Sequence, residues 1–187
     1  RRGSGTGGED FPEQVNELFS YLHPDPDSPP NRVRAFPGEG LNIPVWLLGS
    51  SGFSAQLAAY LGLPFAFASH FAPEYLLPAL DLYRSHFRPS AWLREPYVMV
   101  GVNVFAADTE AEARRLATSH QRQFLNIIRG QRGMLAPPVD HLDDVWNPYE
   151  KEVVMRQLRY SAIGDASSLK DQLKEIIDET KADELIV

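Results

Sequence analysis

Cysteine is absent from this sequence of 187 residues, which excludes disulfide bonds, thiolate nucleophiles and zinc–sulfur sites. No apolar run approaches the roughly 20 residues that a bilayer-spanning helix needs, and the first residues lack the apolar core of a secretory signal. Positive charge is also scarce, because 18 Lys and Arg stand against 25 Asp and Glu, a net charge of −7. This balance disfavours binding to nucleic acid or to anionic lipid. We therefore expect a cytoplasmic protein that acts without nucleic acid and without a membrane.

Several motifs of common enzyme classes are missing. The sequence has no G-x-S-x-G, H-E-x-x-H or G-x-G-x-x-G pattern, so hydrolase, metalloprotease and Rossmann functions have no support. His141, Asp143 and Asp144 are metal-ligating types, but three such residues crowded into a Pro-rich loop favour a solvated loop. Arg129 and Arg132 could meet a phosphate, although cations at a helix end explain them more simply. We predict no metal site.

Apolar runs alternate with helical patterns along the chain. We expect helices over 11–22, 54–61, 72–87, 109–128 and 168–180, and strands over 45–48, 64–68, 97–106 and 184–187. Residues 1–9 are expected to be flexible, 23–40 to form a Pro-rich loop, and 130–150 to form a long insertion loop. Alternation of strand and helix predicts parallel strands with right-handed crossovers.

Single residues refine these boundaries. Gly62 is well placed to end its helix, and Pro78 predicts a kink or a late start in the helix of 72–87. Thr109 and Glu112 have the spacing of a capping box. Ser167 and Ser168 are interpreted as caps of the last helix, although barrel folds often have a phosphate site in this region.

Four strands in this order make either half of a (β/α)8 barrel or a small open sheet. In an open sheet, the final "ELIV" would leave an apolar edge exposed. We therefore predict an α/β fold of the (β/α)8 TIM-barrel class, of which residues 1–187 supply roughly the second half, strands five to eight, as part of one domain. The sequence also begins without methionine, and we expect it to be part of a longer chain.

A cluster of small residues joins the first apolar run to the next helix in "VWLLGSSGFSAQLAAYL". Gly49, Ser50, Ser51 and Gly52 form the corner, and Ser54 lies in the first helical turn. In a parallel α/β protein this corner lies at the carboxyl end of the strand, where ligands bind. The N–H groups of a helix start favour an anion such as phosphate, and serine hydroxyls add donors. Serine and glycine are also ordinary cap and turn residues, so both interpretations stay open here.

The stretch "LLGSSGFSAQLAAYLGLPFAFASHFAP" resembles the strand-five to strand-six region of the bacterial-luciferase-like flavin monooxygenases. The resemblance continues through "PYVMVGVNVFAADTEAEARRLA", which is similar to the seventh strand and its helix. It ends with "GDASSLKDQLKEIIDETKADELIV", similar to the last helix and the eighth strand, so that nearly the whole chain is covered. This family implies a TIM barrel that uses reduced FMN and oxygen on a small organic substrate.

Carried over residue by residue, the resemblance implies that the flavin phosphate binds after strand five. Ser50, Ser51 and Ser54 would donate hydrogen bonds, and Gly49 and Gly52 would shape the turn.

The resemblance also implies that Ser69, His70 and Phe71 lie at the barrel mouth, near the isoalloxazine ring or the substrate. A capping or hydrogen-bonded loop histidine explains His70 equally well. Much of the flavin-binding surface in this family belongs to the first four strands, including the histidine linked to the reaction with oxygen. None of those positions lies in this chain. We therefore assign no catalytic residue and expect this chain by itself to be inactive.

The resemblance further implies a homodimer and a flavin reductase that supplies reduced FMN. Three alternatives stay open. The first is a deazaflavin-dependent reductase of the same superfamily, and the second is a non-catalytic flavin-binding protein. The third is a free-standing half-barrel that dimerises to rebuild the barrel.

Overall fold

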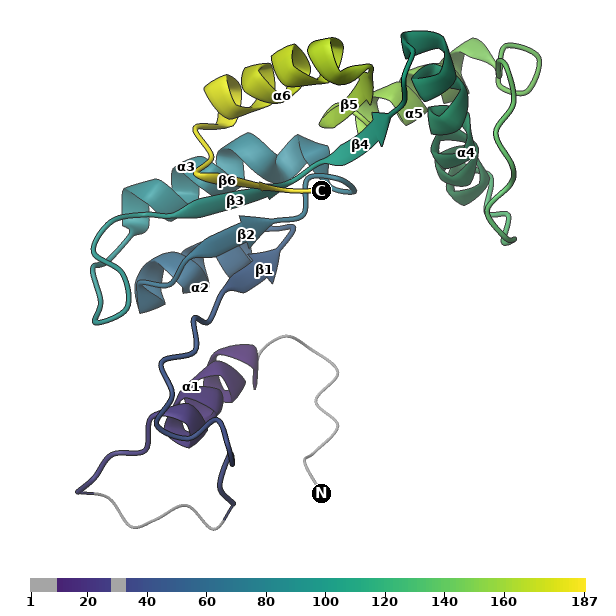
Figure 1. Cartoon of the computed structure of the whole chain (residues 1–187). Coiled ribbons are helices and arrows are strands. Elements are labelled where there is room, and N and C mark those ends of the chain that lie inside the picture. The colour runs from purple at the N-terminus through teal and green to yellow at the C-terminus, as the bar shows by residue number, and fades with distance from the viewer. Residues whose placement is uncertain (1–9, 28–32) are drawn as a thin grey trace. The chain divides into compact units, whose positions relative to one another are not determined.

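The computed structural model describes residues 10–27 and 33–187 (Figure 1). The chain divides into two compact units, Arg1–Val45 and Trp46–Val187. The expected flexible segment 1–9 lies outside the described residues, as do residues 28–32 of the expected Pro-rich loop.

The first unit contains helix α1 (Phe11–Leu22), which matches the predicted helix. Pro12 lies in its first turn, where a missing N–H costs no intrahelical hydrogen bond. Val15 and Leu22 are its buried residues, and the N–H of Gly40 donates to the carbonyl of Leu22 at 2.8 Å. The described residues between α1 and the end of this unit form no further helix or strand.

The second unit alternates strands with helices. Its elements are β1 (Leu47–Gly49), α2 (Gly52–Leu61), β2 (Phe65–Phe67), the 3₁₀ helix η2 (Pro73–Tyr75), α3 (Leu76–His86), β3 (Val98–Gly101), β4 (Asn103–Ala106), α4 (Glu110–Ile128), α5 (Pro148–Gln157), β5 (Ser161–Gly164), α6 (Ala166–Thr180) and β6 (Glu184–Ile186). One sheet has the order β1-β2-β3-β6, and a second sheet pairs β4 with β5. Every pairing is parallel, which confirms the predicted α/β class.

Local signals explain several boundaries. The helix expected over 72–87 starts late, because η2 precedes α3. Pro78 is then the third residue of α3, in the first turn, where the N–H that proline lacks would have had no acceptor within the helix. Gly62 ends α2 with a φ of 62°, in the left-handed region that glycine tolerates. A Cβ at Gly62 would also lie 2.4 Å from the carbonyl oxygen of Arg88, so this position needs glycine twice over.

The prediction missed one helix and one strand. The insertion loop was expected to run to residue 150, but α5 begins at Pro148, and its start is closed by a capping box between the N-cap Asn147 and Glu150 of the first turn. β5 lies where no element was assigned, and it pairs with β4. The strand expected over 97–106 is divided at Val102: β3 pairs with β2 and β6, whereas β4 pairs with β5. The strand count therefore exceeds the four that were expected.

The two faces of the larger sheet differ. Leu47, Phe65 and Val98 stand side by side in register and are buried, and Figure 1 shows α2 and α3 on one side of the strands. Leu48 points to the opposite face, because successive side chains of a strand alternate, and it is 64% exposed. Ile186 of β6 is 52% exposed. The core of the unit thus lies between the sheet and its helices.

Tyr83 anchors α3 to the strands. Its ring is fully buried, and its hydroxyl donates to the carbonyl of Leu63 at 2.9 Å. The same oxygen accepts from the N–H of Tyr97 at 3.1 Å. Burial raises the pKa of this hydroxyl, so it stays protonated and can donate. These two hydrogen bonds therefore fix the position of α3 relative to β2 and β3.

Candidate functional site

The carboxyl ends of β1 and β2 lie side by side. Gly49 pairs with Phe67, and the N–H of Ala68 donates to the carbonyl of Gly49 at 2.9 Å. The two groups of predicted site residues, one after each strand, are therefore neighbours at one edge of the sheet. This edge is where ligands bind in parallel α/β proteins.

The start of α2 is open. Its N-cap residue is Ser51, whose side chain makes no capping hydrogen bond among the residues that the structure describes. By contrast, Thr109 caps α4, Asn147 caps α5 and Asp165 caps α6 through side-chain oxygens. Ser51 is exposed and Ser50 is half-buried. The first N–H groups of α2 can therefore serve an anion instead of a side chain.

Ser54 has a different place from the other serines of the corner. It is only 7% exposed, and its hydroxyl donates to the carbonyl of Ser51 at 3.0 Å. A Cβ at Gly49 would lie 1.8 Å from the hydroxyl oxygen of Ser54, so glycine is what lets this serine pack onto the strand. Ser54 thus supports the corner from within. Gly52 has its own constraint, because a Cβ there would lie 3.3 Å from Leu82.

The hydroxyl of Ser69 likewise forms a hydrogen bond within the fold. Ser69 is fully buried, and its hydroxyl donates to the carbonyl of Gly101 at 2.5 Å. This bond joins the end of β2 to the end of β3. The resemblance implied a place near the flavin ring or the substrate, and the structure shows that the hydroxyl already has an acceptor within the chain.

His70 lies against a glycine of the neighbouring strand. A Cβ at Gly101 would lie 2.5 Å from Nδ1 of His70, so the missing side chain makes room for the imidazole. The carbonyl of His70 accepts from the amide of Asn103 at 3.2 Å. Its ring meets Phe71 edge to face, with the centroids 4.8 Å apart. Nδ1 is buried without a hydrogen-bond partner among the described residues.

Further polar groups of this region were not predicted. Ser161 stands opposite Asn103 in the β4–β5 register, so both side chains point to the same face. The hydroxyl of Ser161 is buried and has no partner within the described part of the chain. The sequence analysis did not place Ser161 beside Asn103, because β5 was missing from the prediction and its pairing with β4 was therefore unknown.

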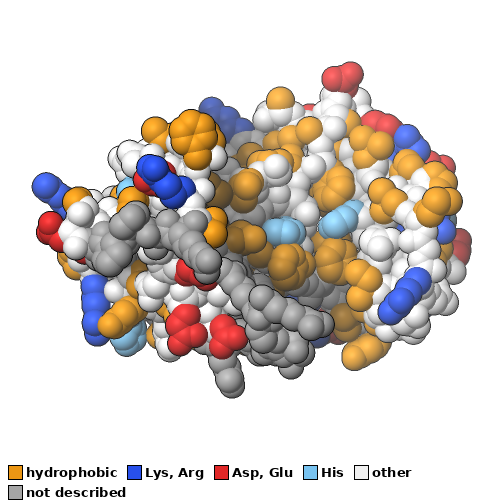
Figure 2. Space-filling model, turned by 90° about the horizontal axis from the view of Figure 1, so that it is seen from below, with side chains coloured by type: hydrophobic (Ala, Val, Ile, Leu, Met, Phe, Trp, Pro, Cys, Tyr) orange, Lys and Arg blue, Asp and Glu red, His pale blue; other side chains and the backbone are white. Residues whose placement is uncertain are grey.

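His120 of α4 was also not predicted. Its ring lies 5.5 Å from that of Phe105 and 5.0 Å from that of Phe124, and its Nε2 is buried without a described partner. Burial lowers the pKa of His120, and the nearby His70 lowers it further. Figure 2 shows histidine side chains among hydrophobic ones on one face of the molecule. The helical spacing from Ala113 and Ala117 to His120 is a signal that could have identified it.

The start of α6 differs from the start of α2, and the predicted caps need a correction. The cap is Asp165, whose carboxylate accepts from the N–H groups of Ser167 and Ser168 at 3.1 and 3.0 Å. The two serines are the capped residues, not the caps. These hydrogen bonds lower the pKa of Asp165. A carboxylate already occupies this helix start, which disfavours a phosphate there.

The remaining candidates have structural partners or lie in solvent. Arg129 forms an ion pair with Glu150 at 2.8 Å, which joins the end of α4 to α5. Asp143 pairs with Lys151 at 3.2 Å, while His141 and Asp144 are exposed. In residues 10–27 and 33–187, no three His, Asp or Glu side chains are arranged to hold a metal ion. None of the helices described there is long and apolar enough to cross a membrane.

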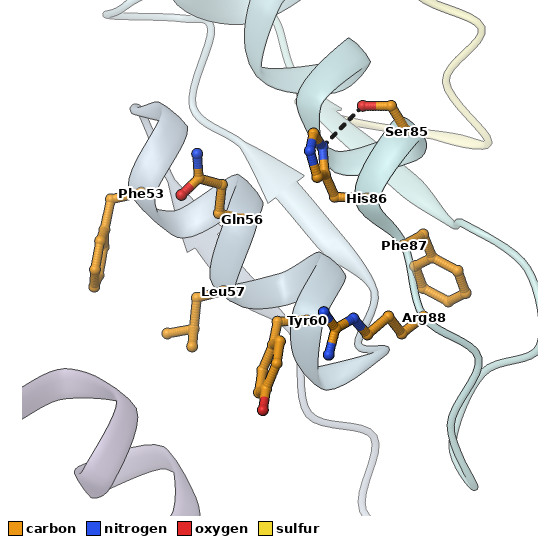
Figure 3. Close-up of a pocket in the computed structure, with 8 residues that line it drawn as sticks. All are labelled: Phe53, Gln56, Leu57, Tyr60, Ser85, His86, Phe87 and Arg88. Carbon is orange, nitrogen blue, oxygen red and sulfur yellow. Dashed lines mark hydrogen bonds between the residues drawn. The ribbon is translucent and has the colours of Figure 1, made fainter.

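A cavity of about 640 Å³ lies between α2 and the end of α3 (Figure 3). Figure 3 shows Phe53 and Tyr60 pointing from α2 away from the strand behind it. The guanidinium of Arg88 lies 4.5 Å from the centre of the Tyr60 ring. This cavity belongs to the helix layer and not to the carboxyl ends of the strands, so it is not the candidate site.

Comparison with known proteins identifies the family of this chain. The sequence model of a family described as "Luciferase-like monooxygenase" matches residues 15–183. "Uncharacterized protein YvbT" of Bacillus subtilis (strain 168) is 53% identical over 180 residues, which are 96% of this chain and 53% of that protein. A "Luciferase-like monooxygenase" of Escherichia coli (strain K12) is 50% identical over 179 residues, again 96% and 53% of the two chains.

A solved structure is similar as well. The crystal structure of apo-MsnO8 aligns with a TM-score of 0.72 at 30% identity, over 95% of this chain and 53% of that one. The chain therefore spans about half the length of these relatives. The resemblance seen in the sequence is confirmed, and the chain belongs to the luciferase-like monooxygenase family.

Proposed function

We propose that the full-length protein is a flavin-dependent monooxygenase that uses reduced FMN and oxygen on a small organic substrate. The observation that carries this proposal is the open start of α2 at the carboxyl end of β1. It occurs in a chain that belongs to a family of monooxygenases, at the corner where the family resemblance implies the flavin phosphate.

The residues of the corner fit a phosphate group. The uncapped N–H groups of α2 and the hydroxyls of Ser50 and Ser51 would donate hydrogen bonds to its oxygens. Ser54 holds the carbonyl of Ser51 and thereby the shape of the corner. We therefore propose a narrower set of contacts than the resemblance implies: Ser50 and Ser51 would donate to the phosphate, and the hydroxyl of Ser54 would support the corner.

Reduced flavin, when bound, supplies the electrons for the reaction with oxygen. The residues of this chain would position it and exclude water. The corner after β1 would hold the phosphate end of the cofactor, and the loop of His70 and Phe71 after β2 lies beside that corner.

We further propose that this chain is the second half of a TIM barrel. Leu48 and Ile186, on the sheet face away from the helices, are exposed, and the relatives are about twice as long as this chain. In the full-length protein, the other strands would cover this face and complete the active site. A homodimer, a flavin reductase as the source of reduced FMN, and a cytoplasmic location belong to the same proposal.

The test is a flavin titration of the full-length protein and of the variant Ser51→Asp. An aspartate at the N-cap binds the free N–H groups of the helix and repels phosphate, while it stabilises the helix itself. We expect the affinity for FMN to fall about tenfold, a change of about 1.4 kcal/mol. Riboflavin, which lacks the phosphate, should bind the variant and the parent protein equally well.

Gln56→Asp is the matched control, since it adds the same charge to an exposed position of the same helix. It should leave the affinity for FMN unchanged. Unchanged FMN affinity in Ser51→Asp, or an equal loss for riboflavin, would contradict the phosphate site. Identifying the flavin that copurifies separates this proposal from a deazaflavin-dependent reductase. Oxygen uptake with reduced FMN separates it from a non-catalytic flavin-binding protein.

A further inference from the structure

The outward side of α2 carries no charge. The helix contains no Asp, Glu, Lys or Arg, although a helix that covers a sheet normally presents charged residues to solvent. Phe53, Leu57 and Tyr60 recur at helical spacing and form one stripe along it. Phe53 is 52% exposed and Tyr60 is 61% exposed. An uncharged stripe with two exposed aromatic rings is typical of a surface that binds another molecule.

This stripe forms one wall of the cavity of about 640 Å³ between α2 and the end of α3 (Figure 3). Phe87 belongs to the opposite wall. The volume lies within the roughly 300–1,000 Å³ that small-molecule sites typically have. Among the described residues that line the cavity, none is Asp or Glu. Arg88 is the one permanently charged side chain of the lining, so the cavity is positive in a chain whose net charge is −7.

Arg88 is held in position by its backbone and by its side chain. Its N–H donates to the carbonyl of Ala59 at 2.9 Å, which joins the segment after α3 to the end of α2. Its guanidinium lies 4.5 Å from the centre of the Tyr60 ring, and Figure 3 shows the side chain extended toward that ring. A guanidinium that stacks on a ring keeps the N–H groups at its edge available for hydrogen bonds.

These N–H groups have no carboxylate partner in residues 10–27 and 33–187. Six other arginines each form an ion pair with a glutamate; they are Arg34, Arg114, Arg115, Arg129, Arg156 and Arg159. Arg88 is exposed, so a molecule from solvent can reach it. The planar guanidinium matches a carboxylate, which can accept two of its N–H groups at once.

We propose that this cavity binds an aromatic carboxylate. The carboxylate accepts hydrogen bonds from the Arg88 guanidinium, and the aromatic ring packs on the apolar stripe of α2. The stripe by itself would accept any apolar molecule, and Arg88 adds the preference for an anion. A cation is disfavoured, because the guanidinium already lies over the Tyr60 ring. The inference is independent of the proposed function, since neither Ser50 nor Ser51 lines the cavity.

The test is calorimetric titration of the full-length protein with 2-naphthoate and with 2-naphthylmethanol, a neutral probe that has the same ring system. The parent protein should bind 2-naphthoate about fivefold more tightly than the alcohol. Arg88→Gln should abolish this preference, because it lowers the affinity for 2-naphthoate and leaves that for the alcohol unchanged. Arg94→Gln is the matched control: it removes the same charge from an exposed position that does not line the cavity, and both affinities should stay the same.

A second variant tests the aromatic wall. Tyr60→Ala removes the ring that supports the guanidinium and part of the apolar stripe, so it should weaken the binding of both probes, by about tenfold for 2-naphthoate. Tyr149→Ala is its control, because Tyr149 is 72% exposed at the start of α5 and lies outside the cavity. That control should bind both probes like the parent protein.

Equal affinity of the parent protein for the two probes, or unchanged binding of 2-naphthoate in Arg88→Gln, would overturn the inference. Light scattering on the same preparations tests a second copy of the chain as the occupant. A dimer that either cavity variant converts to a monomer would assign the cavity to a subunit interface and would also overturn it. A mass that neither variant changes supports the small-molecule site.

Discussion

The hydroxyl of Ser69 donates to the carbonyl of Gly101 across 32 residues of sequence, at a distance of 2.5 Å. It joins the end of β2 to the end of β3 and fixes the start of the loop that bears His70. The same Gly101 leaves the space into which the His70 ring fits. One glycine therefore positions this loop both by accepting a hydrogen bond and by lacking a side chain.

Ser69→Ala should lower the free energy of unfolding by about 1–3 kcal/mol, because a buried hydrogen bond is lost and its acceptor keeps no replacement for the hydroxyl. Urea denaturation measures this change. Ser85→Ala is the control, since Ser85 is exposed and its hydroxyl contacts the carbonyl of Leu82 within α3. That variant should change stability by less than about 0.5 kcal/mol. Equal stability of the two variants would contradict the assigned role of Ser69.

Gly49→Ala should destabilise the corner before α2, because the new Cβ would lie 1.8 Å from the hydroxyl oxygen of Ser54 and 2.3 Å from its Cβ. Overpacking of this kind costs about 1–3 kcal/mol, which urea denaturation measures. The double variant Gly49→Ala with Ser54→Gly removes both clashing atoms and should recover part of the loss. Gly133→Ala is the control, since a Cβ there meets no atom within 4 Å. A single Gly49 variant as stable as the double variant would show that the clash is not the cause.

The lowered pKa of Glu150 predicts that the stability of the fold changes in acid. The Arg129 guanidinium and the N–H of Asn147 lower the pKa of this carboxyl from its ordinary 4.5 to about 2. Because the folded-state pKa lies below that of the unfolded chain, the ionised carboxylate stabilises the fold above pH 4.5. This contribution decreases as the pH falls towards 2. Glu150→Gln should therefore be less stable than the parent protein at neutral pH, and the difference should shrink in acid.

Thermal unfolding at several pH values checks the Glu150 prediction. Glu152→Gln alters an exposed carboxylate of the same helix and should follow the parent protein at each pH. A constant difference between the parent protein and Glu150→Gln down to the lowest pH would rule out the ion pair as its source.

Local sequence was a good guide to the helices. The apolar spacing of 11–22 predicted α1, Gly62 predicted the end of α2, and Thr109 predicted the start of α4. These features depend on hydrogen bonds and side-chain contacts within a few residues, so they can be derived from the sequence alone. β5 escaped because "SAIG" has little strand character by itself, and its hydrogen bonds come from β4, far away in the sequence.

The candidate site likewise has features that the sequence predicted and features that only the structure showed. The sequence by itself determined the parallel α/β class, the family, and the placing of glycines and serines where a strand turns into a helix. Only the tertiary structure decided which serines are available to a ligand, because that depends on atoms distant in the chain. Ser51 is exposed, Ser54 is packed against Gly49, and Ser69 is bonded to Gly101. A hydroxyl can donate its proton to a phosphate only where the fold has not already given that proton an acceptor, and that condition is set by packing.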